Sequence, residues 1–296
     1  IFLQTYPIHV IINHGDIMAK KKKKYKLKWK NLIALLIFLI AFIFLIKSGI
    51  DLINYFIDTN NTNEEIKSIE DAVKIEEVPD SDNTEIIEQK EDIPEDNPYW
   101  DYIKMNLISV NFDDLLKINN ETKGWIQVNG TNINYPFVQT SNNDYYLTHS
   151  YDKSYNQAGW VFMDYRNDTV NYDKNTILYA HGMNNKTMFG SLRNILSSSW
   201  YNNTNNHIIK LSTPTENTLW QVFSVYHIET TNDYIQTEFT SDEEYQTFLD
   251  TLKGRSAVTF DTSLNTTDKI LTLSTCYNKT DKVVMHAKLI KREARS

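Results

Sequence analysis

The hydrophobic pattern divides the 296-residue chain into a membrane-type segment, a polar spacer and a globular part. The run 32–46 is apolar and carries no charge, and its extension past Lys47 to Ile50 gives about twenty residues, enough for a helix to span a bilayer. From about Tyr99 onward, short apolar stretches alternate with polar residues and are separated by turn residues. This pattern is typical of β-strands.

The globular part is therefore predicted to be mainly β. Asn129-Gly130 lies between two apolar runs and is a strong hairpin signal. Seven or eight short strands with few helices indicate a barrel or a sandwich. The strands are expected at 124–128, 133–139, 159–163, 176–179, 207–211, 218–227, 257–259, 270–276 and 282–290.

Three helices are expected among these strands. The segments 99–108 and 112–118 are predicted to form two short ones, the second with Asn111 as a candidate N-cap. A clearer helix begins after Ser241, where Glu244 completes a capping box, and ends at Gly254.

The N-terminal third has its own organisation. Residues 1–17 precede Met18, and we expect them to be a non-native upstream extension. The lysine-rich segment 18–31 is expected to stay in the cytoplasm, followed by a transmembrane anchor over 32–50. The alternative, a cleaved signal peptide, fits less well because the run is long and lacks a clear small-x-small cleavage site. The acidic segment 51–98 is predicted to be a flexible stalk that carries an extracellular domain, 99–296.

Composition and net charge exclude several kinds of partner, site and cofactor. The net charge is −8 and no arginine-rich patch is present, which argues against a nucleic-acid partner. One cysteine excludes an intramolecular disulfide framework and a multi-cysteine zinc site. No loop has the ligand spacing of a calcium site, so neither a metal nor another cofactor is expected.

That cysteine, Cys276, ends the predicted strand 270–276, where a rigid scaffold can present a nucleophile. The simpler alternative is a buried thiol that acts as a small hydrophobe. A thiolate nucleophile needs a base or cation nearby, and His181, after an apolar strand and before Gly182, is the favoured base. His286 is the rival candidate, and Lys282 lies across the loop from Cys276, where it could stabilise an oxyanion.

Several motifs resemble those of the sortases, and the finer pattern resembles class B. Thr272-Leu273-Ser274-Thr275-Cys276 looks like the cysteine motif of that family, and Leu178-Tyr179-Ala180-His181-Gly182-Met183 looks like its histidine motif. The resemblance covers about residues 99–290, in order. Further matching segments are Gly124-Trp125-Ile126, Asn143-Asp144-Tyr145-Tyr146-Leu147, Phe162-Met163-Asp164-Tyr165-Arg166-Asn167, Met188-Phe189-Gly190, the segment 230–237 and the helix after Ser241.

The resemblance implies an eight-stranded sortase-type β-barrel with N-terminal helices and an extra helix before the cysteine strand. It implies a cysteine transpeptidase at the cell wall of a Gram-positive bacterium. Cys276 would attack the threonine carbonyl of an Asn-Pro-x-Thr-Asn-like sorting signal, and His181 would transfer protons. The partners would be a surface protein bearing that signal and an amine of a peptidoglycan precursor. By the same analogy, the groove that binds the sorting signal would be lined by Ser274, Thr230, Tyr234, Ile235 and Leu147.

One departure from the family pattern concerns Lys282, which stands where sortases place an arginine. Lysine keeps the charge but loses the planar fork that donates two parallel hydrogen bonds, so reduced but real activity is expected. Two alternatives remain: a hydrolytic cysteine protease that uses water as the acceptor, and an inactive surface module that only binds wall peptides.

Overall fold

The computed structural model describes residues 28–87, 93–168, 170–277 and 280–295. The expected upstream extension 1–17 and most of the basic segment 18–31 lie outside these residues. The chain divides into two units, Ile1–Leu52 and Ile53–Ser296.

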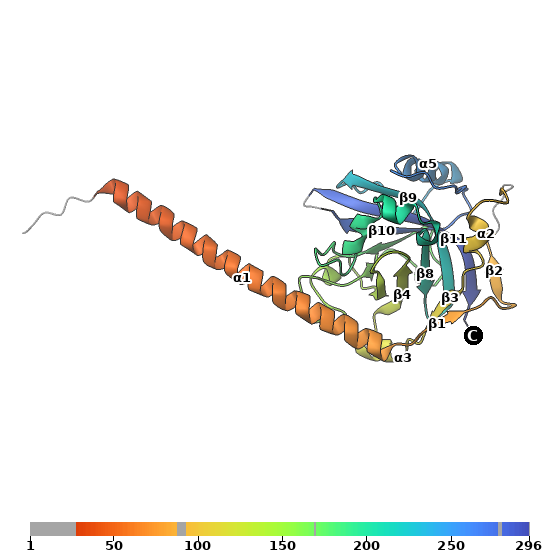
Figure 1. Cartoon of the computed structure of the whole chain (residues 1–296), viewed down its shortest axis with the longest axis horizontal. Coiled ribbons are helices and arrows are strands. Elements are labelled where there is room, and N and C mark those ends of the chain that lie inside the picture. Colours follow the sequence, from red (N-terminus) through yellow and green to blue (C-terminus); the bar gives the residue numbers. More distant parts are fainter. Residues whose placement is uncertain (1–27, 88–92, 169, 278–279, 296) are drawn as a thin grey trace, which may run out of the picture. The chain divides into compact units, whose positions relative to one another are not determined.

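The second unit is built on a closed barrel of eight strands (Figure 1). Their hydrogen-bonded order is β10-β7-β6-β5-β4-β8-β9-β11, and the pairing of β10 with β11 closes the ring. The expected mainly-β barrel is confirmed. In chain order the strands are β4 (Thr122–Val128), β5 (Asn134–Val138), β6 (Phe162–Met163), β7 (Asn175–Tyr179), β8 (Ile208–Ser212), β9 (Glu216–Glu229), β10 (Ile270–Cys276) and β11 (Asp281–Ala294).

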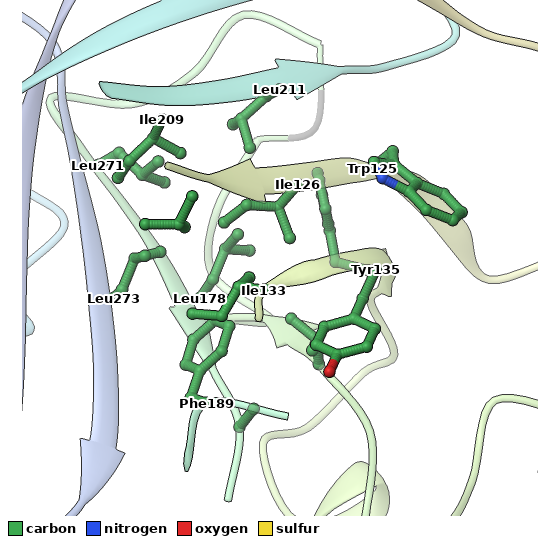
Figure 2. Packing of buried hydrophobic residues seen from close by; sticks show 14 of the residues in the cluster. Trp125, Ile126, Ile133, Tyr135, Leu178, Phe189, Ile209, Leu211, Leu271 and Leu273 are labelled. Atoms are coloured by element: carbon green, nitrogen blue, oxygen red, sulfur yellow. The ribbon is translucent and has the colours of Figure 1, made fainter. Parts of the chain in front are cut away.

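The interior of the barrel is filled by apolar side chains that successive strands direct inward (Figure 2). Ile126 of β4, Leu178 of β7, and Leu271 and Leu273 of β10 are each fully buried there. Burial of such side chains stabilises the fold by about 1.5–3 kcal/mol each. The core therefore fixes the strands that end at the candidate site.

Helix α5 (Asp242–Gly254) packs outside the barrel and makes a second core with β9, β10 and β11. Ser241 Oγ accepts a hydrogen bond from the Glu244 amide at 3.1 Å, as expected of an N-cap. The Glu244 carboxylate reaches the Thr240 amide at 2.7 Å instead of the cap residue itself, so the reciprocal half of the expected capping box is displaced by one residue.

Helix α1 (Trp29–Ala72) begins in the first unit, where its apolar side chains from Leu32 to Ile46 are exposed. Among the described residues it is the one helix long and apolar enough to cross a membrane, with a mean hydropathy of 2.7 in its most apolar window.

The part of α1 within the second unit is docked by one face. Thr62 and Ile69 are buried, and Ile66 packs against the main core, as does Val73 just past the end of the helix. Helical spacing explains the pattern, because residues three and four apart lie on the same side. The sequence predicts a flexible stalk over 51–98, whereas this stretch contains helix and paired strands.

Strand β1 (Ile75–Val78) pairs antiparallel with β3 (Leu107–Val110), and β2 (Thr84–Ile86) pairs with the end of β11. The helix expected over 99–108 ends early: α2 spans Tyr99–Tyr102, and the chain then extends into β3. The partner strand comes from the acidic segment, so local periodicity could not reveal it. The expected strand at 257–259 does not form, because the chain bends there and belongs to no strand ladder. Helix α3 (Asp113–Ile118) forms close to the predicted bounds, but its N-cap is Phe112 and not the expected Asn111, whose side chain accepts a hydrogen bond from the Asp113 amide.

The remaining elements are short. They are η1 (Tyr145–Leu147), η2 (Gly190–Asn194), α4 (Ser198–Tyr201) and η3 (Thr204–Asn206).

Docking of α1 should depend on pH through Glu65. Its carboxylate accepts a hydrogen bond from the Asp152 amide at 2.8 Å, and burial raises the pKa of Glu65 from 4.5 to about 7. The folded protein thus holds this proton more tightly than the unfolded chain does. The stability that Glu65 contributes is complete below pH 4.5 and is lost as the pH rises through 7.

Glu65→Gln keeps an acceptor oxygen and cannot ionise. In thermal unfolding of the full chain in detergent micelles, we expect this variant to match the wild type at acidic pH. Above pH 7 it should exceed the wild type by about 2–4 °C, the equivalent of roughly 1 kcal/mol in a domain of this size. Glu64→Gln, on the exposed side of the same turn, is the control. Parallel curves for Glu65→Gln and the wild type would contradict the assignment.

Candidate active site

The site forms where two neighbouring parallel strands end. Strands β7 and β10 are parallel, and Tyr179 is in register with Ser274. His181 and Cys276 each lie two residues beyond that pair, so the topology brings them to the same edge of the barrel. The Thr275 hydroxyl, which donates to the Ala180 carbonyl at 2.8 Å, fastens the two strand ends together.

Lys282 reaches the same edge from the other neighbour of β10. It is the register partner of Cys276 in the antiparallel β10–β11 ladder. Its Nζ donates a hydrogen bond to Cys276 Sγ at 3.0 Å. The sulfur therefore lies beside a fixed ammonium group, and Cys276 is partly exposed rather than buried in the core.

His181 is oriented by backbone contacts. Its Nε2 lies 2.7 Å from the Leu147 carbonyl oxygen, which can only accept, so the hydrogen-bond network assigns a proton to Nε2. Nδ1 is then the nitrogen that can exchange a proton with a reacting group.

The loop after His181 is packed directly onto the cysteine. A Cβ at Gly182 would lie 2.3 Å from the Cys276 carbonyl oxygen, so only glycine permits this approach. The Gly182 carbonyl accepts from Arg193 at 2.7 Å, and the same guanidinium donates to Asn184. Sequence reasoning missed Arg193, because no local pattern links η2 to this loop.

The rival histidine has a different environment. His286 is fully buried, with Nε2 2.8 Å from the Tyr226 hydroxyl and Nδ1 2.8 Å from the Thr272 hydroxyl. Burial lowers the pKa of His286 to about 3, so it is neutral at physiological pH. Both ring nitrogens are used inside the fold, and we assign His286 to the core.

A cavity of about 450 Å³ opens at this edge, a volume suited to a small ligand or a peptide segment. It brings together all eight site residues expected from the sequence. Cys276, His181 and Lys282 lie on its wall with Ser274, Thr230, Tyr234, Ile235 and Leu147. We refer to it as the first cavity.

Three of these wall residues are held by hydrogen bonds. The Tyr234 hydroxyl lies 2.9 Å from Ser274 Oγ, and both side chains are almost fully buried. Thr230 Oγ1 donates to the Thr280 carbonyl at 2.7 Å. The wall is thus largely preformed.

An ion pair between the buried Asp164 and the exposed Arg166 connects the remaining walls of the first cavity. Arg166 donates from Nε and Nη2 to the two oxygens of Asp164, and a second bond from Nη2 reaches the Ile235 carbonyl at 2.9 Å. Asp164 also accepts from Asn143 and Tyr179, which both line the first cavity. Burial alone would raise the pKa of Asp164, but the hydrogen bonds from Arg166, Tyr179 and Asn143 together outweigh it and hold the pKa below its usual range. Sequence analysis gave neither residue of this pair a role.

A family model of the sortase domain matches residues 126–290. The chain belongs to the sortase family. The matched stretch begins in β4 and ends in β11, so it contains the sortase barrel together with the edge that carries Cys276 and His181.

The relatives narrow the class. Sortase B of Staphylococcus aureus is 40% identical over 184 residues, which are 61% of this chain and 75% of that protein. Sortase B of Listeria monocytogenes is 35% identical over 181 residues, which are 60% of this chain and 73% of that protein. The resemblance to class B is thereby confirmed, and with it the enzyme class, a cysteine transpeptidase that processes sorting signals.

Solved sortase structures agree in fold. A sortase B from B. anthracis has a TM-score of 0.62 at 35% identity and covers 81% of this chain and 99% of its own. The S. aureus sortase B–substrate complex has a TM-score of 0.57 at 39% identity and covers 61% of this chain and 84% of its own.

The close packing of Gly182 generates a prediction. Gly182→Ala must separate the His181 loop from the Cys276 strand, since the added Cβ would meet backbone at 2.3 Å. A displacement near 1 Å at reacting groups can cost about 100-fold in rate. We therefore expect the rate of thiol acylation by a peptide substrate to fall by about 100-fold in Gly182→Ala, as measured by stopped-flow.

Gly254→Ala, where a Cβ meets nothing within 4 Å, is the matched control and should retain the wild-type rate. Equal rates for Gly182→Ala and Gly254→Ala would show that the loop and strand need not touch.

Proposed function

We propose that this sortase is a single-pass membrane enzyme that cleaves an Asn-Pro-x-Thr-Asn-like signal after threonine and transfers the protein to a peptidoglycan amine. In this proposal Cys276 is the nucleophile, His181 the acid–base residue and Lys282 the cation at the reacting centre. The observation that carries it is the convergence of these three side chains at the carboxyl ends of β7 and β10.

The first half-reaction forms a thioester. The Cys276 thiolate attacks the threonine carbonyl carbon, and the carbonyl oxygen becomes an oxyanion. When the intermediate collapses, the carbon–nitrogen bond breaks and the leaving amine takes the proton from His181 Nδ1. The fixed Nε2–H bond to Leu147 keeps the ring in the orientation that this transfer requires.

The second half-reaction reverses these roles. An acceptor amine attacks the thioester carbonyl, the carbon–sulfur bond breaks, and His181 takes the proton that the amine loses. Sulfur leaves as the thiolate that began the cycle. No oxidant, metal or other cofactor enters this balance.

Lys282 can stabilise negative charge at two stages of the catalytic cycle, first on sulfur and then on the oxyanion. In the resting enzyme its ammonium donates to sulfur at 3.0 Å, a contact that can stabilise the attacking thiolate by a charge-assisted bond. When sulfur bonds to carbon, the oxyanion forms beside it, and another of the three N–H groups can turn toward that oxygen.

The first cavity supports the assignment of the sorting signal. Its wall combines apolar side chains such as Leu147 and Ile235 with the hydroxyls of Thr230 and Ser274. An extended peptide offers alternating side chains and backbone polar groups, which such a wall can bind. In this proposal Ser274, Thr230, Tyr234, Ile235 and Leu147 are the substrate-binding residues.

The proposed topology follows from α1. Residues 32–50 would be the anchor, with 18–31 in the cytoplasm and the catalytic domain, 99–296, outside the cell. The docked stretch 53–72 would make the spacer a partly ordered support in place of a free stalk.

The function is tested by product analysis with the full chain and an Asn-Pro-Gln-Thr-Asn peptide. Chromatography with mass detection should show cleavage between Thr and Asn, and with triglycine present the Thr–Gly product should replace the free acid. Free acid alone at every triglycine concentration would favour the hydrolytic protease. An intact peptide would favour the binding module.

Lys282 variants test the role of the cation. Lys282→Ala should lower kcat/KM by about 100-fold, the usual effect of removing one oxyanion donor. Lys282→Arg should raise turnover several-fold, because the guanidinium can donate two parallel bonds. Lys67→Ala, on the exposed face of α1, is the control for loss of a positive charge. If Lys282→Ala is harmless and Lys282→Arg is equal or slower, the role assigned to Lys282 is wrong.

A further inference from the structure

A second cavity, of about 260 Å³, lies against the same cysteine and histidine. Its wall comes from α1, from the loop before β6 and from the loop after β7. The lining residues are Tyr55, Asp58, Gln157, Ala158, His181, Gly182, Met183 and Cys276. Among the described residues, His181 and Cys276 are the two that line both cavities.

A transpeptidase must bring two substrates to one reacting centre. Two cavities that adjoin at that centre satisfy this requirement. The thioester occupies the first cavity while the acceptor amine must still reach the carbonyl carbon bonded to Cys276. The second substrate therefore needs its own approach to the same cysteine and histidine. A cavity that meets the first one at those two side chains provides it.

We propose that the second cavity is the entry site of the acceptor and that the Asp58 carboxylate binds its ammonium group. The inference rests on the proposed function and assigns a binding site to its second substrate, the amine acceptor.

The charges of the two cavities differ in the way this assignment requires. Lys282 lines the first cavity and Asp58 the second. A primary amine is an ammonium ion at neutral pH, so a carboxylate attracts it and a lysine repels it. The oxyanion that forms from the peptide carbonyl is instead attracted by the lysine and repelled by the carboxylate. The acceptor is thus directed away from the cavity that the sorting signal fills.

Asp58 is held in place by its surroundings. One carboxylate oxygen, Oδ2, accepts from the Gln157 amide at 3.3 Å. The next helical turn is fixed as well, because Asn156 Nδ2 donates to Thr62 Oγ1 at 2.9 Å. Tyr55 is three residues before Asp58, on the same helix face, and this aromatic residue also lines the cavity. An ammonium ion is also attracted to such a ring.

The chemical step at this site is balanced. The ammonium bound by Asp58 first releases one proton to water, and the nitrogen lone pair then attacks the thioester carbonyl. His181 Nδ1 takes the second proton as this nitrogen becomes an amide nitrogen. The new carbon–nitrogen bond forms as the carbon–sulfur bond breaks, and the thiolate is regenerated. Asp58 is a binding residue in this scheme and does not itself exchange a proton.

The test is nucleophile partitioning in the full chain in detergent micelles, at neutral pH, with triglycine and hydroxylamine as probes. Hydroxylamine is small and uncharged at neutral pH, so it needs no carboxylate. Asp58→Asn should raise the triglycine concentration for half-maximal transfer by about tenfold, the usual effect of losing one charge-assisted bond. The effect should be confined to triglycine, so the hydroxylamine reaction should keep its rate.

Asp58→Glu should recover most of the triglycine affinity, because it restores the charge. Asp71→Asn, the same change at an exposed position of α1, is the matched control and should behave as the wild type. Unchanged triglycine dependence in Asp58→Asn would overturn the proposal. An equal loss with both nucleophiles would also overturn it, since Asp58 would then act by supporting the fold of the site. A wild type that yields no hydroxamate with any sorting peptide would refute the proposed function itself, and this inference with it.

Discussion

The parallel pairing of β7 with β10 is the constraint on which the rest of the site depends. Parallel strands end at the same edge, and the register of Tyr179 with Ser274 brings His181 and Cys276 to equivalent positions there. A slip of one residue would direct either side chain to the opposite face of the sheet. Buried leucines on both strands and the bond from Thr275 to Ala180 oppose such a slip.

Several elements outside the barrel hold the ends of those strands. The Asp164–Arg166 pair connects three walls of the first cavity, and Arg193 holds the loop after His181. The docked part of α1 supports the loop before β6 through the Asn156–Thr62 hydrogen bond, and it places the Asp58 carboxylate at the second cavity. An apolar barrel thus carries a charged and hydrogen-bonded edge, where rigid positioning matters more than stability.

The sequence predicts a mainly β barrel or sandwich and the candidates Cys276, His181 and Lys282 because their signals are local, and the resemblance to sortases favours the barrel. Strand alternation, a cysteine at a strand end and a histidine after an apolar run can each be recognised within a few residues. The docked helix could not be predicted in the same way. Its burial depends on contacts such as Asn156 with Thr62, almost a hundred positions apart, and its acidic composition is typical of a flexible spacer. The role of Arg193 depends on tertiary packing for the same reason.

The central claim is that the β7–β10 edge holds a cysteine that forms a thioester with the sorting signal. Intact mass spectrometry of the full chain, mixed with an Asn-Pro-Gln-Thr-Asn peptide and quenched in acid, tests it most directly. The account predicts a mass increase equal to the peptide acylated through its threonine, lost on hydroxylamine treatment and absent in Cys276→Ala. An adduct that persists in Cys276→Ala, or a peptide that is cleaved without any adduct on rapid quenching, would contradict it.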